Sequence, residues 1–270
     1  MLQIAGKNTA LPTEHPISAH NLFSAYLELG LPVTKRGVNM LIEASKDEET
    51  KKELKQVFDD FDKQITEKRV SLLDLLERYP TIDLPLGAFV ASLMSMRVRQ
   101  YSISSSPLAD PRRVTLTYSV LKGDSLSGRG RHIGVASHYL SHLEPGDIVH
   151  VAVKPSHQSF HLPTDGNVPV LMFGAGTGLA PFRSFIQERA AQIGAGRQLA
   201  PAHLYYGCRH PDQDSLYADE LARWEKMEAV TIHRAYSKAP ELSNGHKHID
   251  EVMRADGQTL LDLWEANARV

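Results

Sequence analysis

The chain has 270 residues, of which 42% are hydrophobic and 23% charged, with a formal net charge of -2. This balance is typical of a soluble globular protein of one large or two ordinary domains, and it offers no basic surface for nucleic acid. No run of about 18 apolar residues is present, so no membrane-spanning segment is expected. The single cysteine, Cys208, excludes an intramolecular disulfide, and the 13 histidines show no spacing typical of metal ligands. We therefore expect a cytoplasmic protein without a metal site.

Residues 1–95 are predicted to be helical. Ser18, Thr34 and Ser71 each precede an apolar stripe at helical spacing, which is the position of an N-cap. Pro80 closes the third of these helices, because proline cannot continue a helix. No repeat or low-complexity linker interrupts this part of the chain.

The pattern changes to strands between residues 96 and 165. Residues 113–121 alternate apolar and polar side chains, and residues 148–153 form a second strand pattern after a Pro-Gly turn. A short helix is expected to begin at Gly134, between these two predicted strands. Short strands joined by turns indicate a small barrel or sandwich.

From residue 166 onward, predicted strands and helices alternate, which is the pattern of a parallel sheet with helical crossovers. Ligands of such sheets bind at the carboxyl ends of the strands. The predicted order is strand 170–173, helix 179–193, strand 202–206, helix 215–227, strand 230–236 and helix 248–255.

A glycine-rich turn follows the first of these strands. Gly174, Gly176 and Gly178, with Thr177 between the last two, separate a short apolar run from the start of a helix. Glycines let the backbone approach a phosphate, and unpaired N–H groups at a helix start point toward it. Such a turn also serves simply to pack a strand tightly against a helix, and the turn alone leaves both interpretations open.

A second motif lies about 70 residues upstream and reads RQYSISSSP, from Arg99 to Pro107. Arg99 could pair with a phosphate, Tyr101 could stack on a flat ring, and the serine hydroxyls could hydrogen-bond a cofactor. The alternative is an alternating strand that enters a Ser-Pro turn. The order of the two motifs suggests a flavin-binding module followed by a nicotinamide-nucleotide module.

Cationic and hydroxyl side chains follow the two later strands at their carboxyl ends. Arg209 follows the second strand, Ser237 and Lys238 follow the third, and Lys247 and His248 come about nine residues later. Together they could hold an extra phosphate, which would favour NADP over NAD. The alternative is a set of solvated loop cations.

Five motifs then carry a resemblance: RQYSISSSP, GVAS, GAGTGLAPFR, YYGCR, and YSK with HKH. In this order they resemble the diflavin reductase family, specifically the NADPH–cytochrome P450 reductases, and above all the reductase part of self-sufficient P450 fusion proteins. The resemblance covers most of the chain and implies an α/β plus β fold. Residues 1–95 would be a helical connecting region, 96–165 a partial antiparallel FAD-binding barrel, and 166–270 a truncated Rossmann-like NADP-binding domain similar to that of ferredoxin–NADP reductase.

The resemblance also implies the residues that hold FAD. Arg99 would contact the pyrophosphate, Tyr101 would stack on the isoalloxazine ring, and Ser102 would lie near the flavin N5 as the catalytic residue. Other residues implied for FAD are Gln100, the strand residues Thr117, Tyr118 and Ser119, and the helix start at Gly134, Val135, Ala136 and Ser137.

For NADPH, the resemblance assigns the pyrophosphate to the glycine turn and the 2′-phosphate to the later strand ends. Three positions depart from the family pattern: Ala175 replaces a proline, Lys238 stands where arginine is usual, and His248 replaces a tyrosine. The implied NADPH residues are Gly174, Gly176, Thr177, Gly178, Arg209, Ser237, Lys238, Lys247 and His248.

In this family NADPH gives a hydride to FAD, and electrons then pass singly through FMN to a haem acceptor. The resemblance therefore implies an FMN-binding domain and a cytochrome P450 haem domain as partners, in the same parent polypeptide, which could be membrane-associated. Two alternatives stay open: an acceptor of the sulfite reductase or nitric oxide synthase type, or a non-catalytic fragment. Because the FMN domain, the first barrel strands and a terminal cysteine–glycine–aspartate segment are missing, we expect the chain to be a fragment.

Overall fold

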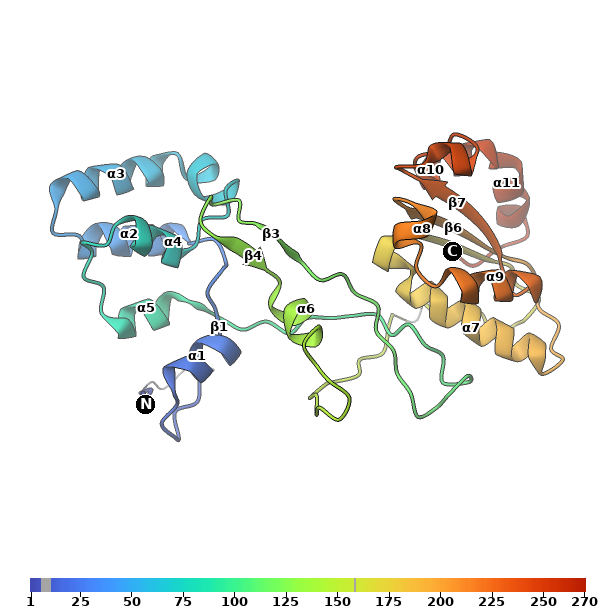
Figure 1. The fold of residues 1–270 in the computed structure, drawn as a ribbon, viewed down its shortest axis with the longest axis horizontal. Coiled ribbons are helices and arrows are strands. Elements are labelled where there is room, and N and C mark those ends of the chain that lie inside the picture. Colours follow the sequence, from blue (N-terminus) through green and yellow to red (C-terminus); the bar gives the residue numbers. More distant parts are fainter. Residues whose placement is uncertain (6–10, 158) are drawn as a thin grey trace. The chain divides into compact units, whose positions relative to one another are not determined.

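A computed structural model describes residues 1–5, 11–157 and 159–270 of the chain (Figure 1). The chain divides into two compact units. The first unit consists of Met1–Arg99 and Val120–Leu143, and the second of Gln100–Ser119 and Glu144–Val270. The division into three domains set out above rests on the resemblance and stays a prediction.

The first unit is mainly helical, as predicted for the first third of the chain. Among the described residues, neither this unit nor the other has a helix long and apolar enough to cross a membrane. The helices of the first unit are α1 (Ala19–Ala25), α2 (Lys35–Ala44), α3 (Glu48–Asp59), α4 (Leu72–Arg78), α5 (Leu86–Ser92) and α6 (Val135–Leu140), with a π-helical turn at Asp62–Thr66.

The three predicted N-caps are confirmed. The hydroxyls of Ser18 and Thr34 each accept a hydrogen bond, 3.1 Å long, from the backbone N–H three residues further on. Ser71 forms a capping box with Asp74, in which each side chain accepts from the backbone N–H of the other residue. These contacts satisfy amides that have no partner inside the helix, so α1, α2 and α4 begin where the sequence predicts.

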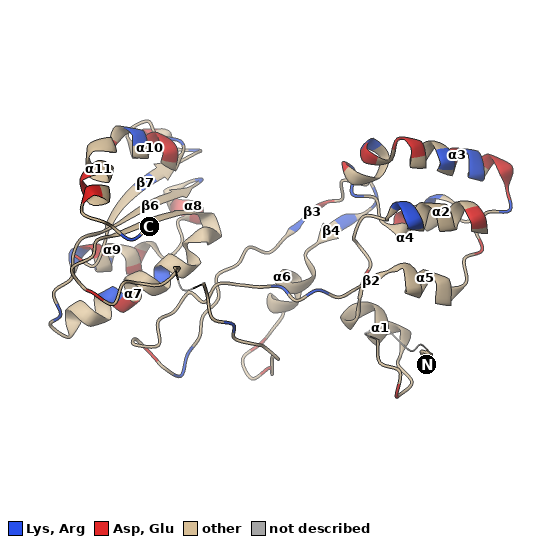
Figure 2. Ribbon diagram, turned by 180° about the vertical axis from the view of Figure 1, so that it is seen from behind, with Lys and Arg blue, Asp and Glu red and all other residues tan. Residues whose placement is uncertain are grey.

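The core of the first unit lies between α2, α3 and α4. Leu41 and Leu54 are fully buried, and Leu75 packs in the same cluster. Figure 2 shows acidic and basic residues along α3, whose polar residues leave only one stripe for the core.

Short antiparallel pairs complete this unit. β1 (Leu27–Glu28) pairs with β2 (Met94–Ser95), and β3 (Lys122–Asp124) pairs with β4 (Arg131–Ile133). The predicted short helix follows β4 directly as α6, with Gly134 at its N-cap.

The strands predicted at residues 113–121 and 148–153 are wrong in this structure. Only Leu116 forms a bridge, with Ile103, and the described residues form no closed barrel. Val151 and Val153, which would share one face of the second predicted strand, are 75% and 74% exposed, so little is packed on that face. An extended segment becomes a strand only when a neighbour takes up a run of its backbone hydrogen bonds, and segment 113–121 has only isolated ones, such as that from Ser104 N–H to the Thr115 carbonyl.

The second unit contains the predicted parallel sheet. Its strands are β5 (Val170–Ala175), β6 (Ala202–Cys208) and β7 (Thr231–Tyr236), in the order β5-β6-β7. The connecting helices are α7 (Ala180–Gly194), α8 (Pro211–Asp214), α9 (Ala218–Lys226), α10 (Ile249–Ala255) and α11 (Gly257–Glu265), with 3-10 turns at Gly176–Leu179 and Pro240–Ser243. All six predicted elements are present, with ends that differ by a few residues.

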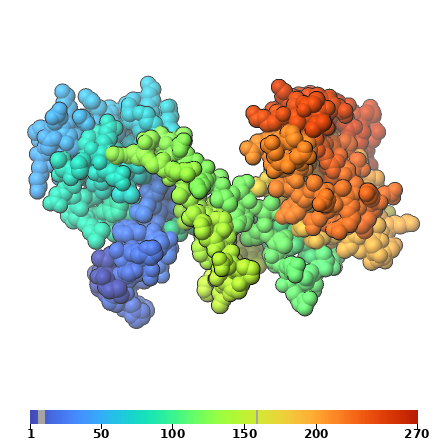
Figure 3. Space-filling view, viewed as in Figure 1, coloured from blue at the N-terminus to red at the C-terminus, as the bar shows by residue number. Residues whose placement is uncertain are grey.

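Helices cover both faces of this sheet. Leu204 of β6 packs toward α7 and α9, where it meets Ile186 and Trp224, whereas its neighbour Tyr205 packs with Val252 of α10. Successive strand residues point to opposite faces, which explains this division. Figure 1 shows α7 and α9 on one side of the strands and α10 and α11 on the other, and the space-filling view in Figure 3 shows their orange and red atoms packed together.

The two outer sides of the sheet are closed differently. Beyond β5, Arg269 returns as a parallel partner: its carbonyl accepts from Leu171 N–H at 2.8 Å. Beyond β7, side chains take the place of a strand, because Ile232 N–H donates to Glu225 at 3.0 Å and Tyr236 N–H donates to the Ser243 hydroxyl at 3.1 Å. Since the chain crosses back past β5, the strand order reverses there, and ligands of such sheets bind at the carboxyl end of that point.

Candidate functional site

The glycine turn lies at the carboxyl end of β5 and leads into α7. A Cβ atom at Gly174 would lie 3.3 Å from the carbonyl oxygen of Gly178 and from the Phe182 ring, so close strand–helix packing favours glycine there. Gly176 has a positive φ of 52°, a conformation that favours glycine.

Gly178 has neither of these reasons to be glycine. Its φ is not positive, and a Cβ atom there would meet nothing within 4 Å. The turn therefore contains one packing glycine, Gly174, and two glycines that border open space, of which Gly178 has no positive φ and lies just before a 15-residue helix. Open space beside backbone N–H groups at a helix start suits an anion, so the residues present fit the pyrophosphate of a dinucleotide.

The predicted 2′-phosphate residues of the two later strands are brought together. Ser237 N–H donates to the Cys208 carbonyl at 3.0 Å, and Lys238 N–H donates to the Arg209 carbonyl at 2.8 Å. The segment before Lys247 joins the same end of the sheet, because Tyr236 N–H donates to the His246 carbonyl. Arg209 and Lys238 are exposed, as a phosphate ligand requires.

Arg209 already has an acidic partner that the sequence did not single out. Its Nε donates to Asp214 at 2.9 Å, and the same carboxylate accepts from the backbone N–H groups of Arg209 and His210. Burial acts to raise the pKa of Asp214, but the hydrogen bonds from Arg209 and His210 outweigh it, so this pKa lies below its usual range. Lys238 and Lys247 are thus the predicted cations of this group for which no ion pair is found among the described residues.

Cys208 lies at the same strand end and is buried. Burial raises the pKa of its thiol to about 11, so it is not ionised near neutral pH.

In the flavin motif, Arg99 is engaged with a buried carboxylate. Its guanidinium forms an ion pair with Glu28, whose side chain is only 4% exposed, and its NH2 group donates to Glu28 Oε2 at 3.1 Å. The hydrogen bond from Arg99 lowers the pKa of Glu28 and outweighs burial, which acts to raise it. Sequence reasoning missed Glu28, which lies 71 positions away on β1.

The aromatic and hydroxyl residues of the motif lie in the second unit. The rings of Tyr101 and Tyr118 meet edge to face with centroids 5.8 Å apart, and Ser102 is exposed. Thr117 is committed to a hydrogen bond of 2.7 Å with the hydroxyl of Tyr217. The structure therefore brings Tyr101 and Tyr118 together and leaves the Ser102 hydroxyl accessible.

The helix start at Gly134 to Ser137 has its own packing demands. A Cβ atom at Gly134 would lie 2.6 Å from the Ser137 hydroxyl oxygen and 2.8 Å from Leu121 Cβ, so only glycine fits. The Ser137 hydroxyl is buried and accepts a hydrogen bond from Leu121 N–H at 3.1 Å. Ser137 thus fastens α6 to the residue before β3, whereas Val135 and Ala136 make no such contact with Leu121.

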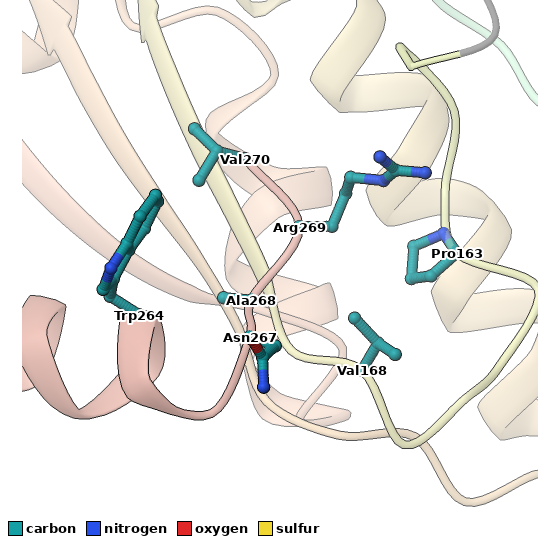
Figure 4. Close-up of a pocket in the computed structure, with 7 residues that line it drawn as sticks. All are labelled: Pro163, Val168, Trp264, Asn267, Ala268, Arg269 and Val270. Atoms are coloured by element: carbon teal, nitrogen blue, oxygen red, sulfur yellow. The ribbon is translucent and has the colours of Figure 1, made fainter.

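A cavity of about 370 Å³ lies at the other end of β5 from the glycine turn (Figure 4). Pro163, Val168 and Trp264 are among its lining residues, together with the last residues of the chain. Because ligands of parallel sheets bind at the carboxyl ends of the strands, this cavity at the amino end is not part of the candidate site.

A hydrogen-bonded chain of side chains lies on the sheet face that α10 and α11 cover. His203 Nδ1 and His233 Nε2 are 2.9 Å apart, and His233 Nδ1 lies 3.2 Å from Asp256. Tyr205 stacks on His233 and donates to Asp256 at 2.5 Å. Burial lowers the pKa of both histidines, and no group of three potential metal ligands occurs in the described ranges.

The geometry therefore defines a protein with a dinucleotide-type glycine turn that follows a flavin-type motif. The FAD binding domain family matches residues 2–139, just over half of the chain, and the oxidoreductase NAD-binding domain family matches residues 172–265. The chain belongs to the FAD binding domain family and continues into an oxidoreductase NAD-binding domain. These two domains identify FAD and a nicotinamide nucleotide as its cofactors.

Similar proteins confirm the resemblance to self-sufficient P450 reductase fusions. The chain is 52% identical over 97% of its length to a bifunctional cytochrome P450/NADPH–P450 reductase of Fusarium oxysporum. It is 47% identical over 98% of its length to a protein of the same description from Acremonium egyptiacum. It is also 47% identical over 97% of its length to a self-sufficient cytochrome P450 monooxygenase of Phanerodontia chrysosporium. The chain spans about a quarter of the length of each of these relatives.

Proposed function

We propose that this chain is the part of a larger flavoprotein that takes reducing equivalents from NADPH into FAD, and that the whole protein then passes electrons through FMN to a cytochrome P450 haem. The observation that carries the proposal is the glycine turn. Gly178 borders open space at a helix start, without a packing reason to be glycine, at the carboxyl end of β5. The names of the relatives, which join a cytochrome P450 to an NADPH–P450 reductase, support the donor and the acceptor.

The residues of the turn would hold the NADPH pyrophosphate. Thr177 and Gly178 lie at the entry to α7, where backbone N–H groups and the helix dipole favour an anion. Lys238 and Lys247 would bind the 2′-phosphate as point charges, with Ser237 as a hydrogen-bond donor and Arg209 and His248 beside them. This set would select NADPH over NADH.

FAD, when bound, supplies a ring that accepts a hydride and releases electrons one at a time. Tyr101 would orient that ring by stacking, beside Tyr118. Ser102 is exposed and would donate a hydrogen bond from its hydroxyl to the flavin N5. Gln100, Thr117 and Ser119 would line the same cofactor, as the resemblance implies.

The pyrophosphate of FAD would be neutralised by Arg99 and by the backbone at Gly134 to Ser137. Support for Arg99 comes from its guanidinium, which Glu28 holds in a fixed orientation. The helix start would contribute its backbone N–H groups, as the resemblance implies.

We further infer that residues 96–165 are part of an antiparallel FAD-binding barrel in the whole protein, between a helical connecting region at 1–95 and the NADP-binding domain at 166–270. The alternation of apolar residues at 113–121 supports this inference, because such a pattern is typical of strands with one buried face, and residues 148–153 add a second strand pattern after a Pro-Gly turn. The partners would be an FMN-binding domain and a P450 haem domain in the same polypeptide. The whole protein would lie in the cytoplasm, or it would be attached to a membrane through parts outside this chain.

The visible spectrum of the purified chain, recorded before and after addition of NADPH without oxygen, tests the proposal. We expect flavin bands that bleach on addition of NADPH. A colourless protein, even after FAD is supplied, would show that the chain does not hold the cofactor and would overturn the proposal for this chain.

Nucleotide selectivity is tested with Lys238→Ala combined with Lys247→Ala. We expect this double variant to weaken NADPH binding about 10-fold to 100-fold and NADH binding much less. The reason is that the two lysines would bind the 2′-phosphate, which NADH lacks. Equal weakening of both nucleotides would place the 2′-phosphate elsewhere.

A further inference from the structure

A buried arginine in α7 joins three parts of the second unit. The side chain of Arg183 is 7% exposed and forms a forked pair with Glu220 of α9, through Nε at 2.8 Å and NH2 at 2.9 Å. Its NH1 group donates to the carbonyl of Ser104 at 2.5 Å and lies 3.4 Å from the Thr115 hydroxyl. One side chain thus ties the flavin-motif segment to two helices of the nucleotide-binding sheet.

The same segment, residues 100–119, has further contacts with these helices. Ser106 N–H donates to the Gln187 side chain at 2.8 Å, and the Ser106 hydroxyl donates to Glu188 at 3.0 Å, both on α7. Thr117 bonds to Tyr217, the N-cap residue of α9. The segment has almost no regular structure of its own, so side-chain contacts rather than a sheet hold it in place.

Tyr217 carries backbone strain at this junction. Its φ of 57° and ψ of 31° place it in the left-handed region, which is unfavourable for a residue with a side chain. The Arg183 guanidinium lies over its ring at 4.2 Å, and its hydroxyl meets Thr117. Strain of this kind persists only where the surroundings enforce it, and it concentrates at functional sites.

A second buried arginine on the same helix shows what a purely structural role looks like. Arg189 is 3% exposed, and it donates to the carbonyls of Ala229 and Ala200 at 2.9 and 2.6 Å. Both partners flank the sheet, and neither belongs to segment 100–119. Arg183 and Arg189 therefore lie on the same helix and are similarly buried, but they bind different groups. Arg183 binds segment 100–119 and α9, whereas Arg189 binds two residues that flank the sheet strands.

We propose that Arg183 is a positioning residue for hydride transfer, which fixes the segment that carries Ser102 against the helices of the nucleotide-binding sheet. The inference rests on the proposed function and adds to it a residue that touches neither the flavin nor the nicotinamide. Arginine is required because only its planar fork can pair with Glu220, reach the Ser104 carbonyl and lie on Tyr217 at once. Lysine keeps the charge, but its single ammonium nitrogen has no planar fork for the paired contact with Glu220 and no flat face to lie on Tyr217.

The test compares Arg183→Lys with Arg189→Lys in the 270-residue chain. Two properties are measured in each: the rate of FAD reduction by NADPH in a stopped-flow instrument, and amide hydrogen exchange across residues 102–117. Arg183→Lys is expected to slow reduction about 10-fold to 100-fold, because a small displacement of reacting groups is costly, while the NADP⁺ dissociation constant changes by less than about twofold. The deuterium isotope effect of NADPH labelled at the transferred position should rise in the same variant.

Amide exchange at residues 102–117 should be faster in Arg183→Lys and unchanged in Arg189→Lys. The only expected effect of Arg189→Lys is a lower melting temperature. Tyr217→Phe, which keeps the ring and removes the bond to Thr117, should show a smaller change in the same direction. The proposal is overturned if Arg183→Lys retains the wild-type rate and exchange, or if both lysine variants slow reduction equally.

The exchange measurement also separates this proposal from the proposed function. If NADPH does not reduce wild-type chain supplied with FAD, the proposed function fails for this chain. Faster exchange at residues 102–117 in Arg183→Lys alone would then still establish Arg183 as the residue that holds this segment. Unchanged exchange would overturn its positioning role.

Discussion

The nucleotide-binding sheet and the middle of the chain differ in whether the strands predicted from the sequence form. All three predicted strands form in the sheet, whereas those predicted at 113–121 and 148–153 do not. In the sheet, Leu204 and Tyr205 are fully buried by helices that the same stretch of chain supplies. In the middle, Ile148 and Val153 are 83% and 74% exposed although the sequence predicts a strand there as well. A strand pattern thus predicts a segment that needs a packing partner, and the exposed side chains at 148–153 show that this partner is lacking there.

The largest expected effect compares one substitution in both regions. Ile186→Ala, in the core between α7 and the sheet, should cost about 2–5 kcal/mol of unfolding free energy, because it leaves a cavity. Ile148→Ala should stay within about 0.5 kcal/mol, since exposed side chains contribute little. Urea unfolding of the two variants measures both effects. A large loss in Ile148→Ala would mean that this segment is packed in solution, which would remove the contrast.

A smaller effect is expected where the flavin side depends on a buried ion pair. Arg99→Ala should destabilise the first unit by roughly 2–3 kcal/mol and lower its FAD content, because it leaves the Glu28 carboxylate buried without its partner. The matched control is Arg99→Ala combined with Glu28→Gln, which removes the unpaired charge and should recover most of the stability. Recovery of FAD content together with stability would show that Arg99 acts on the flavin only through folding.

The glycine turn permits a sharper test on the nucleotide side. Gly174→Ala should cost about 1–3 kcal/mol of stability, since its Cβ would press on backbone 3.3 Å away. Gly178→Ala should leave stability nearly unchanged and weaken NADP⁺ binding about tenfold, or about 1.4 kcal/mol, because the methyl group occupies the space proposed for the phosphates. Thermal unfolding and calorimetric titration separate the two. Unweakened binding in Gly178→Ala would contradict the assignment of this space.

The smallest effect is a pH dependence in the sheet. Burial lowers the pKa of His203 and His233 below the ordinary value of 6.5, so the unfolded chain takes up protons more readily than the folded one. Stability should therefore be constant above this value and should fall as the pH drops through 6.5 toward the folded pKa. His203→Gln should flatten the decline, measured as urea midpoints between pH 7.5 and 5. An equally steep decline in that variant would assign the titration to other groups.

Local signals in the sequence predicted most of the fold. Ser18, Thr34 and Ser71 are caps whose partners lie three residues away, so the sequence alone contains both halves of each contact. The parallel sheet was predictable for a similar reason, because each strand is followed at once by the helix that covers it. The glycine turn belongs with these features, since strand, turn and helix are contiguous.

Contacts between distant positions were not predictable. Glu28 and Arg99 lie 71 positions apart, and Arg183 and Ser104 lie 79 apart. The sequence around either residue of such a pair does not identify its partner. The predicted strands at 113–121 and 148–153 failed for the same physical reason, since a strand is defined by a neighbour that periodicity does not identify.

The closed outer side of β7 affects where the purified chain is expected to aggregate. Glu225 and Ser243 accept from two of the β7 amides through which a foreign strand would attach, so they oppose the joining of two copies of the sheet at this side. No comparable guard covers residues 148–153, whose apolar side chains face outward. Loss of soluble material on concentration should therefore begin in the middle of the chain, and a peptide-level footprint of early aggregates would find protection there first.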